Sequence, residues 1–171
     1  MGAPKPRVST EIIPYIFYRD VPAALGWLAR AFGFTEEMRH ATPGGMHAQM
    51  TRDGQRIMMG QGSKEWKMLS ARETEAATQG IFVYLADVDA HYERARKAGA
   101  EIVHPPRDEP YGRTYTARDL DGHPWFFTTP PAEGYRGFRM PGDKGKDRRQ
   151  SSALQQRISI AFYRHRRVQE R

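Results

Sequence analysis

One pattern occurs twice along this chain, and it limits the possible folds more than any other property of the sequence. Residues 12–34 and 80–102 each contain a short run of β-forming residues, then Asp-Val, then a segment of helical periodicity that ends near a glycine. The two Asp-Val pairs lie 67 positions apart, and Gly33 and Gly99 lie 66 positions apart. Because both landmarks repeat at nearly the same spacing, they indicate an internal duplication.

Each copy has the signals of a strand followed by a helix. Asp20 and Asp87 stand where a side-chain oxygen accepts hydrogen bonds from the first unpaired amides of a helix. Gly33 and Gly99 follow the helical segments and can adopt the left-handed conformation that turns the chain back.

Three further strands are expected after each helix. Runs of β-forming residues between turn signals place these strands at 35–41, 45–52, 55–61, 101–104, 113–118 and 124–129. In the second copy we expect a longer loop from Pro105-Pro106 to Gly112. Each copy therefore reads βαβββ, and the expected fold class is α+β. We place module one at 9–61, a polar linker at 62–79 and module two at 80–131.

The remaining residues, 132–171, form a basic tail. They contain 11 Lys/Arg and four Asp/Glu, whereas residues 1–131 contain 16 of each, so the net charge of +7 belongs to the tail. We expect this C-terminal extension to be flexible or a lone helix. Because the body of the protein is neutral, a nucleic-acid partner is not expected.

The composition excludes several other classes. The chain has no Cys, so disulfides and thiolate chemistry are excluded. No run approaches the roughly 18 apolar residues of a membrane span, and the N-terminus is unlike a secretory signal. We therefore expect a soluble cytoplasmic protein without a membrane partner.

Two stretches carry a family resemblance. Residues 14–34 resemble the opening of the vicinal-oxygen-chelate superfamily, which includes glyoxalase I, extradiol dioxygenases and bleomycin-resistance proteins. Residues 84–129 resemble its closing module and contain the Asp-x-x-Gly-His-x-Trp pattern of a glyoxalase-like branch, here Asp119, Gly122, His123 and Trp125. The resemblance covers about residues 9–130. It implies that each module curls into a half-open barrel and that the pocket lies within or between subunits of a homodimer.

Metal-using members of this superfamily place His, Gln or Glu ligands at four strand positions. Counted from the Asp-Val and Asp-Gly landmarks, three of these positions fall on Ile13 (or Pro14 with a one-residue slip), Gly80 and Phe126. The fourth falls near Met59, with Gln61 as the nearest polar residue. Since a metal ion needs several fixed donors, we expect no metal and no other cofactor.

The same comparison points to an apolar, aromatic cleft. By alternation, Ile13, Tyr15 and Phe17 share one strand face, and the family picture makes that face the pocket wall. The candidate ligand-binding residues are Tyr15, Phe17, His47, Gln49, Phe82, Tyr84, Arg113, Tyr115 and Phe126. The alternative for the aromatic residues is that they fill the barrel as core. The alternative for His47 and Gln49 is an exposed strand face.

Two other residues leave alternatives open. Arg113 has the planar fork that binds an anionic group, but it also suits a surface ion pair, for which Asp119 is a candidate partner. Trp66 in the linker either covers the mouth of the pocket or packs at a dimer seam. No catalytic residue can be assigned from the sequence.

Three functions remain. The first is a metal-free, dimeric protein that binds a small organic molecule and sequesters a drug or metabolite, as bleomycin-resistance proteins do. The second is a metal-dependent lyase, isomerase or dioxygenase of the same superfamily. The third is an interaction protein whose basic tail contacts nucleic acid or another anionic partner. We favour the first because the donor positions are apolar.

Overall fold

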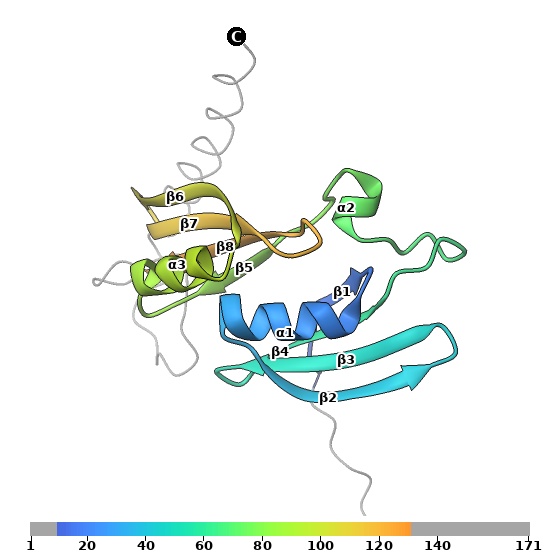
Figure 1. Cartoon of the computed structure of the whole chain (residues 1–171). Coiled ribbons are helices and arrows are strands. Elements are labelled where there is room, and N and C mark those ends of the chain that lie inside the picture. Colours follow the sequence, from blue (N-terminus) through green and yellow to red (C-terminus); the bar gives the residue numbers. More distant parts are fainter. Residues whose placement is uncertain (1–9, 131–171) are drawn as a thin grey trace, which may run out of the picture.

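The structure is a computed structural model of the chain, and it describes residues 10–130 (Figure 1). The first unit consists of β1 (Tyr15–Tyr18), α1 (Val21–Phe32), β2 (Thr35–Thr42), β3 (Gly45–Arg52) and β4 (Gln55–Gln61). A short helix, α2 (Ala71–Thr74), lies in the linker. The second unit consists of β5 (Ile81–Tyr84), α3 (Val88–Lys97), β6 (Glu101–Glu109), β7 (Gly112–Arg118) and β8 (Pro124–Thr129). The predictions for the tail, 132–171, lie outside the described residues.

Each unit forms one four-stranded sheet, and the two sheets have the same topology. Their strand orders are β1-β4-β3-β2 and β5-β8-β7-β6. In each sheet the first strand pairs in parallel with the last, whereas the other pairs are antiparallel. Neither sheet closes into a barrel. The α+β fold with two βαβββ modules, predicted from the duplicated pattern, is confirmed.

The helix signals act as predicted. The Asp20 carboxylate accepts a hydrogen bond from the amide of Ala23 at 2.9 Å, and that of Asp87 accepts one from Ala90 at 3.0 Å. Helix α1 ends at Gly33, whose φ of 75° is the left-handed conformation. Because the two units begin their helices in the same way, the duplication extends to local structure.

The helices join the two units into one hydrophobic core. Helix α1 packs on β2, β3 and β4, helix α3 packs on β6, β7 and β8, and the two helices contact each other (Figure 1). The ring of Phe32 at the end of α1 lies 5.2 Å from that of Trp125 and 4.8 Å from that of Phe127, both on β8. Each sheet therefore has one face covered by its helix and an opposite, open face.

The Asp-x-x-Gly-His-x-Trp pattern of residues 119–125, which we call the closing motif, holds the two units together. The Asp119 carboxylate accepts hydrogen bonds from the hydroxyl of Tyr18 on β1 at 2.6 Å and from the indole N–H of Trp125 at 3.0 Å. Asp121 binds the guanidinium of Arg19 at 2.9 and 2.8 Å. His123 donates from Nε2 to the carbonyl oxygen of Phe17 at 2.9 Å. The motif that marks the family in sequence is therefore structural here, because its polar groups bind residues of the first module.

The predicted loop from Pro105-Pro106 to Gly112 is wrong, because β6 continues through both prolines to Glu109. Strand β6 is an edge of its sheet, and its pairing with β7 is irregular between His104 and Arg107. A proline is tolerated on an edge strand or at a bulge, where its missing N–H breaks no ladder bond. The chain turns at Pro110 and Tyr111 instead.

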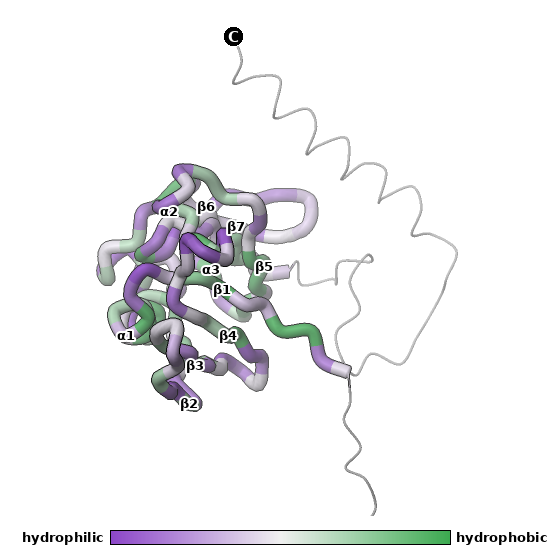
Figure 2. Tube along the Cα trace, turned by 90° about the vertical axis from the view of Figure 1, so that its right-hand side faces the viewer, coloured by the Kyte–Doolittle hydropathy of each residue, from purple (hydrophilic) through white to green (hydrophobic). Residues whose placement is uncertain are grey.

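The exposed start of the described chain is apolar. Figure 2 shows this hydrophobic segment ahead of β1, on the outside of the two modules. Ile12 has 94% of its surface exposed. Among residues 10–130, no helix has the length and apolar character needed to span a membrane.

Candidate ligand pocket

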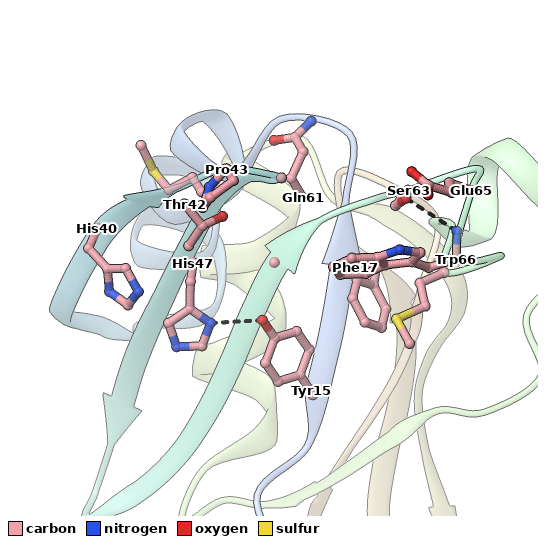
Figure 3. Close-up of a pocket in the computed structure, with 14 residues that line it drawn as sticks. Tyr15, Phe17, His40, Thr42, Pro43, His47, Gln61, Ser63, Glu65 and Trp66 are labelled. Atoms are coloured by element: carbon pink, nitrogen blue, oxygen red, sulfur yellow. Dashed lines mark hydrogen bonds between the residues drawn. The ribbon is translucent and has the colours of Figure 1, made fainter.

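The open face of the first sheet carries a pocket of about 940 Å³, which we call the module-one pocket (Figure 3). Alternation along β1 builds its wall, because Ile16 and Tyr18 face the core whereas Tyr15 and Phe17 face outward. The volume lies within the range of about 300–1,000 Å³ that is typical of sites for organic ligands. The lining residues are Tyr15, Phe17, His40, Thr42, Pro43, Gly44, Met46, His47, Gly60, Gln61, Ser63, Glu65, Trp66 and Met68.

A glycine allows the two polar members of this wall to meet. The Tyr15 hydroxyl lies 2.8 Å from Nδ1 of His47, although β4 separates β1 from β3. Gly60 lies on β4 between them, and a Cβ there would come within 2.7 Å of the Tyr15 hydroxyl oxygen. The absence of a side chain at Gly60 therefore lets the phenol cross the strand. Burial raises the pKa of Tyr15, so its hydroxyl stays protonated.

A second imidazole stands beside the first. His40 on β2 is the direct cross-strand neighbour of His47 on β3, and their ring centroids are 5.1 Å apart. Figure 3 shows both rings on the same side of the β2–β3 hairpin, with Tyr15 next to His47. Within residues 10–130, neither imidazole makes an ion pair with a carboxylate.

A turn in the linker brings a large aromatic ring to the rim of the pocket. Ser63 and Met68 form a small bridge, and the Ser63 hydroxyl accepts a hydrogen bond from the amide of Trp66 at 3.3 Å. This turn places the Trp66 ring beyond Phe17 at the side opposite the histidines (Figure 3), with 67% of the residue exposed. Trp66 therefore lies at the rim of the pocket, which is one of its two predicted positions.

The second module carries a separate group of aromatic rings on its own open face. The ring of Phe82 lies 5.1 Å from that of Tyr84 and stacks at 6.3 Å on that of Phe126. These three predicted residues are therefore together, but they do not line the module-one pocket. The two groups approach each other at a smaller pocket of about 460 Å³, which includes Tyr15 and Phe82 and which we call the seam pocket.

The other three predicted ligand-binding residues lie elsewhere. Tyr115 has no exposed surface and stacks on Phe127, so the prediction that it lines the pocket is wrong and it belongs to the core. Arg113 binds the carboxylate of Asp89 on α3 at 2.6 and 2.9 Å, and that of Asp108 at 3.1 Å. Asp119, the partner considered from the sequence, is occupied with Tyr18 and Trp125.

Gln49 lies on the same strand face as His47, as predicted, but outside the lining of the pocket. Its side-chain amide donates a hydrogen bond to the carboxylate of Glu37. The Gln49 side chain is therefore hydrogen-bonded to Glu37 and does not line the pocket.

The residues at the family's metal positions do not fit a metal ion. Ile13 and Gly80 line the seam pocket, and a Cβ on Gly80 would come within 2.7 Å of the Phe126 ring. The remaining position was expected near Met59, and Met59 itself is buried in the core. The residues of β4 that pair with Tyr15 and Phe17 are Met58 and Gly60.

No alternative set of donors replaces these positions in the described part of the chain. No three His, Asp or Glu side chains of residues 10–130 come together in a way that could hold a metal ion. Gln61, the nearest polar candidate, donates its amide hydrogen to the carbonyl oxygen of Arg19.

His40 and Gly60 are two of the pocket residues that sequence reasoning missed. The Pro43-Gly44-Gly45 turn is visible in the sequence, and a hairpin centred on it places His40 opposite His47. A signal for His40 was therefore available. For Gly60 no local signal existed, because its role depends on the Tyr15 ring, which comes from another strand.

Comparisons with known proteins agree with the fold. The sequence pattern of the Glyoxalase/Bleomycin resistance protein/Dioxygenase superfamily matches residues 10–127. The uncharacterized protein Rv0887c of Mycobacterium tuberculosis (strain ATCC 25618 / H37Rv) is 26% identical over 132 residues, which is 74% of this chain and 78% of that protein.

Three solved structures share the fold. TioX from Micromonospora sp. ML1 is 33% identical, with a TM-score of 0.59 over 72% of this chain and 100% of TioX. TnmS3, an antibiotic binding protein from Streptomyces sp. CB03234, is 17% identical, with a TM-score of 0.58 over 73% of this chain and 100% of TnmS3. A mutant of the fosfomycin resistance protein FosX from Listeria monocytogenes, in complex with Mn(II) and 1S,2S-dihydroxypropylphosphonic acid, is 20% identical. Its TM-score is 0.57 over 74% of this chain and 94% of FosX.

Proposed function

Because this chain belongs to the glyoxalase/bleomycin resistance protein/dioxygenase superfamily, we propose that it is a metal-free member that binds a small organic molecule in the module-one pocket. In this proposal it acts as a cytoplasmic homodimer that sequesters a drug or metabolite, not as an enzyme. The observation that carries the proposal is the chemistry at the metal positions, where Ile13, Gly80 and Phe126 offer no donor.

The fold alone does not choose between binding and catalysis. TnmS3 is an antibiotic binding protein, whereas FosX was crystallised with Mn(II), and both share this fold. The donor positions make the distinction, since a divalent ion needs several side-chain ligands in fixed geometry. In this chain an aromatic ring, Phe126, occupies the space next to Gly80 that a ligand side chain would need.

The walls of the module-one pocket favour an organic ligand with flat, apolar surfaces. Tyr15, Phe17 and Trp66 supply aromatic rings, and Met46 and Met68 supply adaptable thioethers. Tyr15 and Trp66 are exposed, although large rings are normally buried. A ligand that covers them gains the free energy of removing this surface from water.

The homodimer is supported by the exposed apolar surface at the seam pocket. Ile12 and Phe82 line that pocket and are both exposed, and Ile13 lines it beside them. A second copy that covers this surface would remove its contact with water.

Two measurements test the proposed function. Elemental analysis of the purified protein should give less than about 0.1 equivalent of divalent metal per chain, because a metal site needs fixed donors. A thermal-shift screen of aromatic antibiotics and metabolites should then find a stabilising ligand. At a hundred times its Kd, such a ligand stabilises the native state by about 2.7 kcal/mol.

The screen has a matched pair of variants. Trp66→Ala should abolish or strongly reduce the stabilisation, whereas Met38→Ala, at an exposed position on β2 outside the pocket, should leave it unchanged. Stoichiometric metal in the purified protein, or a ligand whose effect survives Trp66→Ala, would contradict the proposal.

A further inference from the structure

The two histidines of the module-one pocket have no internal role that explains them. The buried histidine of the fold, His91, is held by two hydrogen bonds in the core. His40 and His47 lie instead at the surface of the pocket, and their rings contact each other. Among the described residues, His47 binds the hydroxyl of Tyr15, and neither imidazole forms an ion pair with a carboxylate.

Among the described residues, the charged side chains near this pair have partners of their own or lie at the other end of the pocket. Glu37 on β2 is held by the side-chain amide of Gln49, and Arg39 on the same strand pairs with Glu36. Glu65 lines the same pocket, but Figure 3 shows it at the opposite end, beside Ser63 and Trp66. From β1 the titratable group that faces His47 is the phenol of Tyr15, which is neutral.

The Tyr15–His47 hydrogen bond can reverse its direction when the imidazole gains a proton. In the neutral state the Tyr15 hydroxyl can donate to Nδ1 of His47, which lies 2.8 Å away. When both ring nitrogens of His47 carry hydrogen, Nδ1 donates to the Tyr15 oxygen. The hydroxyl hydrogen of Tyr15 is then available to a third group in the pocket.

From this arrangement we propose that the module-one pocket selects aromatic acids, whose ionised oxygen binds the protonated His40–His47 pair and the Tyr15 hydroxyl while the ring lies against Phe17 and Trp66. The inference rests on the proposed function and adds the ligand class to it. Binding then takes up a proton, because histidine is the side chain that changes charge near neutral pH and an anion favours its charged form.

The test compares two probes of nearly the same shape, of which one is an anion and the other a neutral amide. Isothermal titration calorimetry measures the Kd of 2-naphthoate, an aromatic carboxylate, and of 2-naphthamide, its neutral analogue, at pH 6.0 and pH 8.5. At pH 6.0 the full chain should bind the acid at least about tenfold more tightly than the amide, because charge-assisted hydrogen bonds are stronger than neutral ones. At pH 8.5 this preference should disappear. The binding enthalpy at intermediate pH should vary with the ionisation enthalpy of the buffer, which reports proton uptake.

The variants assign the effect to the histidine pair. The His40→Gln/His47→Gln double variant should bind both probes with the affinity that the parent has for the amide, at both pH values. His104→Gln, a histidine replacement on β6 outside the pocket, should behave like the parent. Both variants keep the basic tail. A loss of the acid preference in the double variant alone would therefore assign that preference to the histidine pair and not to the tail.

The outcomes distinguish the inference from the proposed function. Equal affinity of the parent for acid and amide would overturn the selection for acids and leave the pocket as a binding site. An acid preference that persists in the double variant would also overturn it. If neither probe binds, the aromatic-acid class is wrong, and the thermal-shift screen decides independently whether the pocket binds another ligand.

Discussion

His91 fills a position in the core where a neutral imidazole makes two hydrogen bonds. Its Nε2 lies 3.2 Å from the carbonyl oxygen of Phe32, which can accept only, so Nε2 carries the hydrogen. Its Nδ1 therefore accepts from the Tyr115 hydroxyl at 2.7 Å. One neutral tautomer satisfies both partners, and a second proton on Nδ1 would make the Tyr115 hydroxyl an acceptor instead of a donor.

This environment makes the stability of the protein depend on pH. Burial lowers the pKa of His91 from 6.5 to about 4, and the nearby cations Arg52 and Arg94 add to the effect, although the bond to Phe32 opposes it. The imidazole of His91 binds its second proton less tightly in the folded state than in the unfolded state. The contribution of neutral His91 to the free energy of unfolding is therefore complete above about pH 6.5. It is lost as the pH falls towards 4, and the total loss is about 3 kcal/mol.

We predict that His91→Gln removes this pH dependence. The variant should be less stable at pH 7.5 by about 1–3 kcal/mol, since it disturbs two buried hydrogen bonds. The gap in unfolding free energy between parent and variant should narrow as the pH falls from 6.5 to 4.5, measured by urea unfolding. His104→Gln, on the edge strand β6, should give a curve parallel to that of the parent. A constant gap for His91→Gln would contradict the assignment.

The aromatic residues show what alternation along a strand can and cannot predict. It placed Tyr15 and Phe17 on the same open face, and the structure agrees. It did not place Tyr115 correctly, because that side chain lies on the face of β7 that α3 covers. Packing of a distant helix decides that, and local sequence does not record it.

At the scale of elements, strand β6 marks the limit of turn signals. Two consecutive prolines normally indicate a loop, and the prediction ended the strand at residue 104 for that reason. The strand continues to Glu109 because it lies at the edge of its sheet and its pairing is irregular there. Edge position is a property of the sheet order β5-β8-β7-β6, which the resemblance to the family implied only in outline.

The turn between β7 and β8 is the element that we expect to be most sensitive to substitution. The Asp119 carboxylate accepts four hydrogen bonds, from Tyr18, Trp125 and the backbone amides of Asp121 and His123. Asp119→Ala leaves these donors without their acceptor and should cost about 3 kcal/mol or more. The melting temperature should therefore fall by about 10 °C, measured by circular dichroism.

The control for this prediction is a carboxylate that pairs at the surface. Glu101→Ala breaks the exposed ion pair with Arg118 and should change the stability by less than about 1 kcal/mol. If Asp119→Ala and Glu101→Ala had similar effects, the closing motif would not hold the two modules together in the way the contacts indicate.

At the scale of the whole molecule, the duplication predicted two equivalent modules but not how their open faces relate. The helices α1 and α3 contact each other, and the aromatic groups of the two modules remain separate, apart from the seam pocket. Within residues 10–130, Tyr15 therefore lines both the module-one pocket and the seam pocket, whereas Tyr84 and Phe126 line neither of them. No property of either module alone encodes this arrangement, because it depends on how the pair packs.

The seam pocket leads to the last prediction, which concerns assembly. Ile12 and Phe82 are 94% and 46% exposed. A second copy that covers them would remove this apolar surface from water. Light scattering coupled to size exclusion should give the parent about twice the 19.6 kDa mass of one chain. The Ile12→Lys/Phe82→Lys variant should elute as a folded monomer, since a buried, unpaired charge opposes association. Met38→Lys, at an exposed position on β2 away from the seam, should remain dimeric. A parent that is monomeric would refute the homodimer but not the module-one pocket, whose described lining comes from one chain.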